Sequence, residues 1–503
     1  MLETRPEDES APDLRAATLS GVKWTSGARL LAELAAFATS IVLARLIAPA
    51  EFGATVVAIF AAAVGQSVTM QGVGAYLVHA GAPSAPHDRA AMMLSLLVGL
   101  AGTLIVAVFA LTAAEPLFGA RAAELTLLAA PVMLLGALAA VPMAHLQRAL
   151  DFRRLAVVEA GMSLAGPLVA VLLAAVGLEA EALIGGLLAS AATAAVLAAA
   201  YVRPARPAWH ARELGEIASY GLPAAGSSVL YSVMRNVDYV ILAAKVPAAQ
   251  VGFYLRAFQL GSDYQSKISG VLLRVSFPVL SRSRDLDEVR RIRARMIRVH
   301  AAVLFPLLFG LIALAPVFVP LAYGEAWEPA VELTQVLAVA GLVSVLGTGT
   351  GPLLLATGHP RALFRYNLAA LVAFVAGVMI AVPHGVLAVC WTVAGVTAAT
   401  FLVLQYAVVE RVVGIPLSET LSDAVPALTA GLALLATAWL GVRALDPALP
   451  DALVLLTAGP ASLLVYLLAM RFAFPGTWLD LVTLARTLRP GKPSAANMRL
   501  PGA

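Results

Sequence analysis

Long apolar runs follow one another along almost the whole chain, and short polar or proline-containing segments separate them. About 20 apolar residues suffice to cross a bilayer as an α-helix, because each residue adds about 1.5 Å. The pattern predicts an all-α polytopic membrane protein with about fourteen transmembrane helices. The expected helices are Val22–Leu46, Phe52–His79, Arg89–Thr112, Ala122–Gln147, Phe152–Val176, Glu181–Val202, Leu214–Ala244, Val251–Ser281, Val299–Val319, Pro329–Thr357, Ala362–Val382, Gly385–Val409, Leu421–Val442 and Ala452–Phe472.

A weak internal repeat divides these helices into two halves. ARLIAPAEFG (Ala44–Gly53) aligns with AAKVPAAQVG (Ala243–Gly252), and each segment ends one predicted helix and opens the next. Two pseudo-symmetric six-helix lobes followed by two further helices are therefore expected, a plan typical of transporters. The predicted parts are a cytoplasmic tail (1–21), an N-lobe of helices one to six (22–202), a cytoplasmic linker (203–213), a C-lobe of helices seven to twelve (214–409), helices thirteen and fourteen (421–472) and a cytoplasmic C-terminal tail (473–503).

Composition supports the membrane assignment and narrows the chemistry. Hydrophobic residues make up 60% of the chain and charged residues 13%, against about 25% charged in soluble proteins. The single cysteine, Cys390, excludes a disulfide framework, and the seven histidines show no spacing suited to zinc. The polar segment 1–22 lacks the apolar core of a signal peptide, so the first helix is expected to remain uncleaved.

The placement of the basic residues predicts the orientation. With the N-terminus inside, 25 of the 34 Lys and Arg residues fall in cytoplasmic segments, 4 fall in outer segments and 5 lie within helices. This bias favours cytoplasmic N- and C-termini, and it supports an even number of helices. The densest run, Arg282–Arg298, is expected to be a cytoplasmic loop that contacts anionic lipids, with partner docking as the alternative. Trp24, Trp209 and Trp327 lie near predicted helix ends, as interface anchors do.

Charges interrupt the apolar pattern most densely between Ser219 and Ser281, in predicted helices seven and eight. Arg235 and Asp238 lie three residues apart in helix seven, so they share a face. In helix eight, Arg256, Asp263, Lys267 and Arg274 follow at spacings of 7, 4 and 7. At about 100° per residue they fall within roughly 40° of one another, on a stripe about 27 Å long.

A charge at the centre of a membrane helix costs roughly 2.5–3.5 kcal/mol. We therefore expect these side chains to face a water-filled cavity, where guanidinium groups and an ammonium would hold a phosphate-bearing substrate. Two alternatives stay open. Arg235 and Asp238 could form an interhelical ion pair, and the outer members of the stripe, Arg256 and Arg274, could extend to the interfaces while Asp263 neutralises Lys267.

Arg29 and Glu33 form a further pair at i, i+4 in predicted helix one. They are either a headgroup contact with a titratable carboxylate or a snorkelling arginine with a local partner. Glu33, Asp238 and Asp263 are candidate proton or sodium sites. No other cofactor is expected, and no phosphate-binding Gly-Lys-Ser/Thr loop suggests direct use of ATP.

Two further sets of residues are interpreted as having an architectural role, or either an architectural or a substrate-binding role. Arg45 with the following PAEFG segment is expected to shape a turn at the interface. The polar residues of helix two either line the cavity or bond to other helices. They are Gln66, Ser67, Thr69 and Gln71.

Several segments resemble the Wzx-type oligosaccharide flippases, which belong to the multidrug/oligosaccharidyl-lipid/polysaccharide exporter superfamily. SIVLARLIAPAEFG followed by GVGAYLVHA is similar to the opening of these proteins, and NVDYVILAAKVPAAQVGFYLRAFQL with VLLRVSFPVLS is similar to their helices seven and eight. The similarity extends from about Thr18 to Arg411. By position, Arg29 and Arg235 match cavity cations of the family, whereas family members vary at Arg256, Lys267 and Arg274.

This resemblance implies a flippase of the bacterial inner membrane that works by alternating access and is not an enzyme. Its substrate would be an undecaprenyl-pyrophosphate-linked oligosaccharide destined for exopolysaccharide, O-antigen or capsule. Membrane lipids, a polymerase and glycosyltransferases are the implied partners, and no nucleic acid is expected. The alternatives are a cation-coupled multidrug antiporter, a lipid II-type flippase, or a membrane enzyme. The excess of basic over acidic residues in helices seven and eight disfavours the antiporter, and the short loops disfavour the enzyme.

Overall fold

The computed structural model describes residues 35–79, 84–270, 272, 286–356, 359–445 and 449–488. The regular structure of these residues is entirely helical, and eleven of the helices are long and apolar enough to cross a membrane. The predicted all-α polytopic fold is therefore confirmed.

The number fourteen stays a prediction, because three expected helices are not among the eleven. Of the first expected helix, Val22–Leu46, the structure describes only the apolar part Ala35–Leu46. The seventh corresponds to α10, Ala211–Ala243, which has 33 residues but is less apolar, because serine, glycine and tyrosine interrupt its middle and charged residues lie toward both ends. The eighth expected helix, Val251–Ser281, begins as α11, Ala248–Phe258. Its expected range includes residues that the structure does not describe. These are the helices on which the sequence places its candidate site residues.

The contact pattern divides the chain into two compact units. Unit 1 contains the described residues of Met1–Leu260, Ala315–Leu337 and Asn367–Val396. Unit 2 contains those of Gly261–Leu314, Ala338–Tyr366 and Thr397–Ala503. The predicted lobe boundaries stay predictions.

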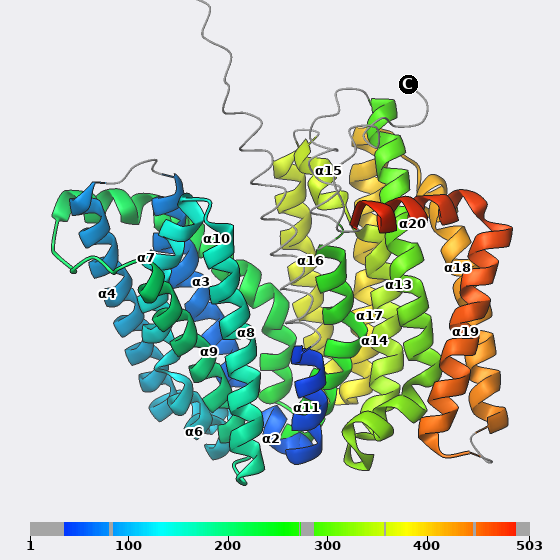
Figure 1. The fold of residues 1–503 in the computed structure, drawn as a ribbon, viewed down its shortest axis with the longest axis horizontal. Helices are drawn as coiled ribbons and strands as arrows, with labels where there is room; N and C mark the ends of the chain where they lie inside the picture. Colours follow the sequence, from blue (N-terminus) through cyan, green and yellow to red (C-terminus); the bar gives the residue numbers. More distant parts are fainter. Residues whose placement is uncertain are drawn as a thin grey trace, which may run out of the picture. The chain divides into compact units, whose positions relative to one another are not determined.

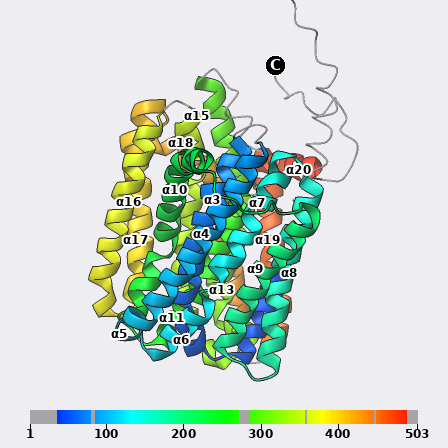
Figure 2. The same cartoon turned by 90° about the vertical axis from the view of Figure 1, so that its left-hand side faces the viewer.

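Unit 1 is a helical bundle in which α3 packs against α7 and α10, and α8 packs against α9 (Figures 1 and 2). Its elements are α2 (Pro49–Ala54), α3 (Val56–His79), α4 (Ala85–Phe109), η1 (Ala110–Ala114), α5 (Glu115–Phe118), α6 (Ala120–Ala129), α7 (Val132–Arg148), α8 (Phe152–Ala175), α9 (Ala180–Tyr201), α10, α11, η3 (Glu325–Trp327) and η4 (Val382–His384).

Unit 2 is built around α18 (Leu417–Leu445) and α19 (Asp451–Ala473), which pack together. It also contains α15 (Thr350–Ala356), η5 (Gln405–Val413) and α20 (Pro475–Leu488). The chain crosses between the units within η2 (Gln259–Asp263), α13 (Leu286–Tyr323), α14 (Ala330–Gly347), α16 (Pro360–Ala381) and α17 (Val386–Leu404).

Local sequence signals set several helix boundaries. Pro49 opens α2 after an extended Ala48, since a proline in the first turn lacks only an N–H that would be unpaired anyway. The Asp151 side chain caps α8 by accepting a hydrogen bond from the Arg154 backbone N–H at 3.1 Å. Pro131 separates α6 from α7, so the single predicted helix Ala122–Gln147 is interrupted there.

The two copies of the internal repeat pack directly against each other in unit 1. A Cβ atom on Gly53 of α2 would overlap the carbonyl oxygen of Ala248, and one on Gly252 of α11 would overlap that of Pro49. The contact is reciprocal, because Gly53 aligns with Gly252 and Pro49 with Ala248 in the repeat. Only glycine therefore allows the two helices to approach this closely.

One arginine ties α2 to the rest of the bundle. The Arg121 guanidinium donates to Glu51 of α2 at 2.8 and 3.0 Å and to Glu181 of α9 at 2.6 and 2.9 Å. The contact with Glu181 is bidentate, and both bonds to Glu51 end on one carboxylate oxygen, so the guanidinium holds α2 against α9 through four hydrogen bonds.

We predict that Gly53→Ala and Gly252→Ala each lower the apparent melting temperature of the detergent-solubilised protein. A methyl group forced against a backbone carbonyl costs at least about 1–3 kcal/mol. Size-exclusion chromatography after stepwise heating measures the change. Gly226→Ala in α10 is the matched control, because nothing lies within 4 Å of its added Cβ. Equal melting temperatures for all three variants would contradict the prediction.

The dense arginine run is not the loop that the sequence suggested. Residues 286–298 form the first turns of α13, so the predicted start at Val299 is wrong by more than three turns. The acidic residues of this segment, Asp287 and Glu288, lie in the first turn of the helix, where they complement its dipole.

The guanidinium groups of this helical segment bind other parts of unit 2. Arg293, 3% exposed, donates to Thr420 at 2.8 Å and to Gln405 at 3.1 Å. Arg298 donates to Asp423 of α18 at 2.9 Å and to Asp480 of α20 at 3.2 Å. The expected role of the run as a lipid contact therefore does not apply to these two residues, whose partners lie within the protein.

Within the predicted C-terminal tail, α20 runs crosswise to its neighbouring helices in unit 2 (Figure 1). Its Asp480 also pairs with Arg295 at 3.0 Å. Trp478 and Leu481 pack against the apolar core that α13, α18 and α19 share. The helix is thus docked by both charge and apolar contact.

We predict that Asp480→Ala destabilises the protein, because it removes the partner of two arginines. Charge-assisted hydrogen bonds contribute about 1.5–3 kcal/mol each at most, less where exposed. Leu479→Ala is the control on the same helix, since Leu479 is 64% exposed. The heating assay should rank the variants accordingly, and a larger loss for Leu479→Ala would refute the assignment.

Candidate translocation site

Five of the eight predicted site residues lie in the described part of the chain. They are Arg235, Asp238, Arg256, Asp263 and Lys267. Arg29, Glu33 and Arg274 lie outside the described residues. The binding and coupling roles assigned to all eight stay predictions, and the structure adds the surroundings of five of them.

Arg235 and Asp238 of α10 differ in exposure although they lie less than one turn apart. The Arg235 side chain is exposed, eight residues before α10 ends at Ala243. Asp238 is 1% exposed and accepts a hydrogen bond from the Tyr254 hydroxyl of α11 at 2.6 Å. The carboxylate therefore helps to join α10 to α11, whereas the guanidinium reaches the surface of unit 1.

Arg256 is enclosed by aromatic rings within unit 1. Its guanidinium carbon lies 4.2 Å from the centre of the Phe52 ring and 5.7 Å from those of Tyr323 and Trp327. One guanidinium nitrogen donates to Gln259 at 2.9 Å. Aromatic faces attract cations, so this arrangement lowers the cost of burying a charge that is only 4% exposed.

The first half of predicted helix eight, Val251–Ser281, departs from a continuous α-helix. Residues Gln259–Asp263 form the π-helix η2, so the α-helical spacing of 100° per residue does not apply across them. Arg256 before it is buried, Asp263 is half-buried, and Lys267 after it is exposed. The Lys267 ammonium lies 5.2 Å from the centre of the Tyr264 ring. The predicted single stripe is therefore not uniform in exposure.

Arg45 has the architectural role that its sequence context suggested. Its guanidinium donates to the backbone carbonyls of Leu321 and Ala322, the latter at 2.9 Å, at the C-terminal end of α13. A cation there satisfies carbonyl groups that have no partner within the helix. Trp327, expected as an interface anchor, is instead buried and donates to the Ala44 carbonyl at 2.8 Å.

Small polar and glycine residues join α3 to α10. Ser67 and Ser232 share a hydrogen bond of 2.7 Å, and a Cβ on Gly221 would overlap the carbonyl oxygen of Gly72. For Ser67 the interhelical alternative is therefore supported. Thr69 bonds to backbone carbonyls of its own helix, and the Gln71 side chain lies outside the described part.

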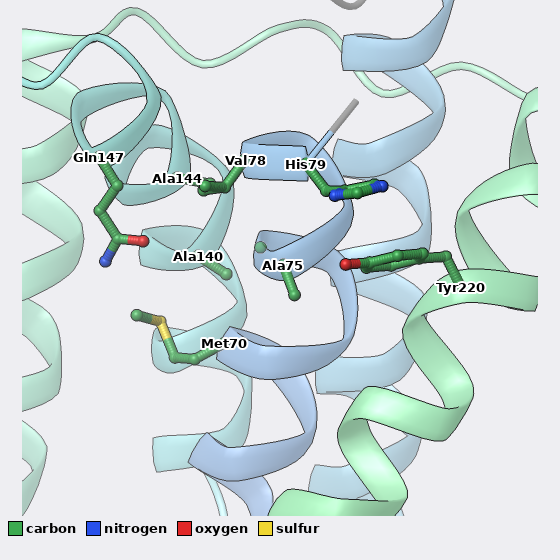
Figure 3. Close-up of a pocket in the computed structure, with 9 residues that line it drawn as sticks. Met70, Ala75, Val78, His79, Ala140, Ala144, Gln147 and Tyr220 are labelled. Carbon is green, nitrogen blue, oxygen red and sulfur yellow. The ribbon is translucent and has the colours of Figure 1, made fainter. Parts of the chain in front are cut away.

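A pocket of about 540 Å³ opens at one end of unit 1, between α3, α7 and α10. Its floor consists of small residues, including Ala75 of α3 and Ala140 and Ala144 of α7. Gln147 of α7 and Tyr220 of α10 extend toward it from opposite sides (Figure 3). Pockets of this size hold small-molecule ligands.

One wall of the pocket is held in place by stacked rings. The His79 ring lies 4.9 Å from the Tyr220 ring at an interplanar angle of 14°. Tyr76 contacts Tyr220 edge-on at 6.1 Å and stacks on His87 at 6.2 Å. His87 in turn pairs with Glu216 of α10 at 3.1 Å. These contacts connect α3, α4 and α10 and restrict the rotation of Tyr220.

Sequence reasoning missed this pocket. Charges inside apolar runs were the signal it followed, and the pocket's polar groups carry no such signal. The usable signal was the position of three polar residues near predicted helix ends. His79 and Gln147 end predicted helices two and four, and Tyr220 follows the start of helix seven. The predicted orientation places all three of these ends on the cytoplasmic side.

Residues 42–332 match the model of a family described as polysaccharide biosynthesis protein, and they make up more than half of the chain. The chain belongs to this family. Together with the eleven helices that are long and apolar enough to cross a membrane, this membership places the protein among membrane components of polysaccharide biosynthesis.

Two proteins with sequences similar to this chain are also named for the biosynthesis of a polysaccharide or a related polymer. The chain is 27% identical over 379 residues to the lipopolysaccharide biosynthesis protein WzxC of Escherichia coli (strain K12), covering 73% of this chain and 75% of WzxC. It is 28% identical over 206 residues to the teichuronic acid biosynthesis protein TuaB of Bacillus subtilis (strain 168). That match covers 39% of this chain and less than half of TuaB, 43%.

Solved structures confirm the fold of the family member. The inward closed conformation of the lipid II flippase MurJ superposes with a TM-score of 0.69 at 14% identity, covering 90% of this chain and 98% of MurJ. An inward-facing multidrug resistance MATE family transporter superposes with a TM-score of 0.57 at 14% identity, covering 74% and 92% of the two chains. At this identity the likeness concerns the fold.

We predict that Tyr254→Phe lowers the melting temperature, because it removes a donor from the buried Asp238 carboxylate. The loss of one partner of a buried charged acceptor costs about 1–3 kcal/mol. Tyr231→Phe is the matched control, since Tyr231 lies on α10 and is 62% exposed. An unchanged melting temperature for Tyr254→Phe would show that the carboxylate does not depend on this bond.

Proposed function

We propose that the protein is an inner-membrane flippase for a lipid-linked oligosaccharide. The substrate would be an undecaprenyl-pyrophosphate-linked repeat unit, moved from the cytoplasmic to the periplasmic leaflet by alternating access. Both termini would be cytoplasmic. Transport, with no catalysed bond change, would be its contribution to the synthesis of an exopolysaccharide, O-antigen or capsule.

Family membership and fold support the class of this proposal. WzxC and TuaB are named for the biosynthesis of polymers, and a third relative is the succinoglycan biosynthesis transport protein ExoT of Rhizobium meliloti, 27% identical over 344 residues, or 66% of this chain and 68% of ExoT. The fold is shared with a flippase of another lipid-linked precursor, lipid II.

The exposed guanidinium of Arg235 is the observation that carries the substrate assignment. It lies within a membrane-length helix, where a charge without function is costly. A guanidinium pairs with phosphate oxygens through two parallel hydrogen bonds. Lys267 in unit 2, the other exposed cation among the described residues predicted to bind substrate, carries an ammonium that attracts phosphate as a point charge. A pyrophosphate-linked amphiphile fits this chemistry better than the cationic drugs of a multidrug antiporter.

The energy source and the partners belong to the same proposal. A proton or sodium gradient would drive the cycle, with Glu33, Asp238 and Asp263 as candidate coupling sites. Of these, Asp238 is buried and hydrogen-bonded, and Asp263 is half-buried in a π-helix. A polymerase and glycosyltransferases would act on the same lipid-linked substrate on either side of the transport step.

We expect Arg235→Ala and Lys267→Ala to abolish polymer export and to leave the amount of folded protein in the membrane unchanged. The reason is that each removes an exposed cation without opening the core. Polymer at the cell surface and lipid-linked precursor in the cytoplasmic leaflet are the two measurements. Lys245→Ala, an exposed lysine in the turn between α10 and α11, is the control.

Normal export in both variants would exclude these residues as the substrate site. Ethidium efflux by the purified, reconstituted protein would instead favour the multidrug antiporter. Each outcome is independent of the other, so the site and the transport class are tested separately.

A further inference from the structure

The pocket beneath His79 and Tyr220 differs chemically from the cationic sites. None of the described residues that line it is an acid, a lysine or an arginine. Its polar groups are an amide, a phenol and an imidazole, from Gln147, Tyr220 and His79. The pocket therefore suits a neutral ligand with many hydrogen-bonding groups and does not suit a phosphate.

These three groups can each donate and accept hydrogen bonds. Sugar hydroxyl groups do the same, so each contact can form in either direction. All three side chains are exposed, so they pair with water in the absence of a ligand. A hydrocarbon tail would displace this water without replacing its hydrogen bonds, whereas sugar hydroxyl groups would replace them. The apolar floor at Ala75, Ala140 and Ala144 would cover the C–H face of a sugar ring.

The Tyr220 hydroxyl is prepared for binding before any ligand arrives. Stacking by His79 and edge contact with Tyr76 fix the ring. Figure 3 shows Tyr220 and Gln147 on opposite sides of α3, and both line the pocket. A fixed donor loses little rotational freedom when it binds, so it contributes more to affinity than a mobile one.

The pocket and Arg235 share one helix. Tyr220 and Arg235 are 15 residues apart on α10, which corresponds to about 22 Å along its axis. A short oligosaccharide attached to a pyrophosphate could span a distance of this order. The pocket also lies at the end of unit 1 that the basic residues predict to be cytoplasmic, where such a substrate would enter.

We propose that this pocket binds the glycan of the lipid-linked substrate. The inference rests on the proposed function and adds to it a separate site for the sugar, formed by Gln147 and Tyr220 with His79 as support. Arg235 would hold the pyrophosphate, so the two ends of the headgroup would be recognised by different chemistry.

The test compares two lipids bound to the full-length protein in nanodiscs free of glycolipid. One is undecaprenyl pyrophosphate, and the other is the same lipid carrying the host oligosaccharide, extracted from cells in which export is blocked. The wild-type protein should bind the glycosylated lipid about tenfold more tightly or better. The double variant Gln147→Leu, Tyr220→Phe should lose this preference, because each side chain contributes one or more hydrogen bonds.

The double variant should keep its affinity for the sugar-free lipid, and Arg235→Ala should weaken both lipids. The control is Gln250→Leu with Tyr231→Phe, which changes the same residue types at exposed positions away from the pocket. Melting temperatures verify that each variant is folded, and Gln147→Leu and Tyr220→Phe are measured singly if the double variant is not.

Four results would overturn the assignment. If the wild-type protein binds both lipids equally, or if the pocket variants keep the preference, the glycan does not occupy this pocket while the flippase proposal stands. If the pocket variants weaken both lipids alike, the pocket holds the tail or the pyrophosphate. If the wild-type protein binds neither lipid, the proposed function and the pocket assignment fail together.

Discussion

Close approach of backbones through glycine sets the geometry on which unit 1 depends. Helices in a bilayer gain little from burying apolar side chains against one another, because lipid is equally apolar. They must therefore gain from close contact. Gly53 and Gly252 meet across the internal repeat, Gly72 and Gly221 meet between α3 and α10, and Gly166 and Gly186 meet between α8 and α9. A side chain at any of these contacts would meet backbone atoms of the partner helix.

The second constraint is the cost of removing a charge from water, and the chain meets it in several ways. Arg121 binds two carboxylates, Arg256 lies among aromatic rings, and Asp238 accepts a hydrogen bond from a buried tyrosine. Contacts of this kind offset the cost of burying a charge. Arg235 and Lys267 contrast with them, since their side chains are exposed. This contrast is why we place substrate binding at these two residues.

The separation of charged and neutral polar chemistry suits an amphiphile with a composite headgroup. A cationic group binds phosphate strongly but distinguishes sugars poorly, whereas an amide and a phenol bind hydroxyl groups and have no net charge to attract phosphate. A protein that moves a lipid-linked oligosaccharide needs both, because the pyrophosphate is common to many such lipids and the sugars differ. The residues around the pocket at His79 and Tyr220 would then influence which substrate is carried.

The sequence by itself determined the helical membrane fold, the repeat and the family resemblance, because each depends on apolar run length or on local similarity. It also identified Arg45 as architectural from the proline and glycine that follow it. Only the tertiary structure decided which charges are buried. Spacing along an ideal helix placed Arg256 with Lys267, but a π-helix lies between them, and three aromatic residues that are all far away along the chain enclose Arg256. The arginines of residues 286–298 resembled a loop because their partners, Asp423 and Asp480, are more than a hundred residues away. The pocket was likewise formed by three helices that the chain visits separately. Periodicity records neighbours along the chain, and burial depends on neighbours in space.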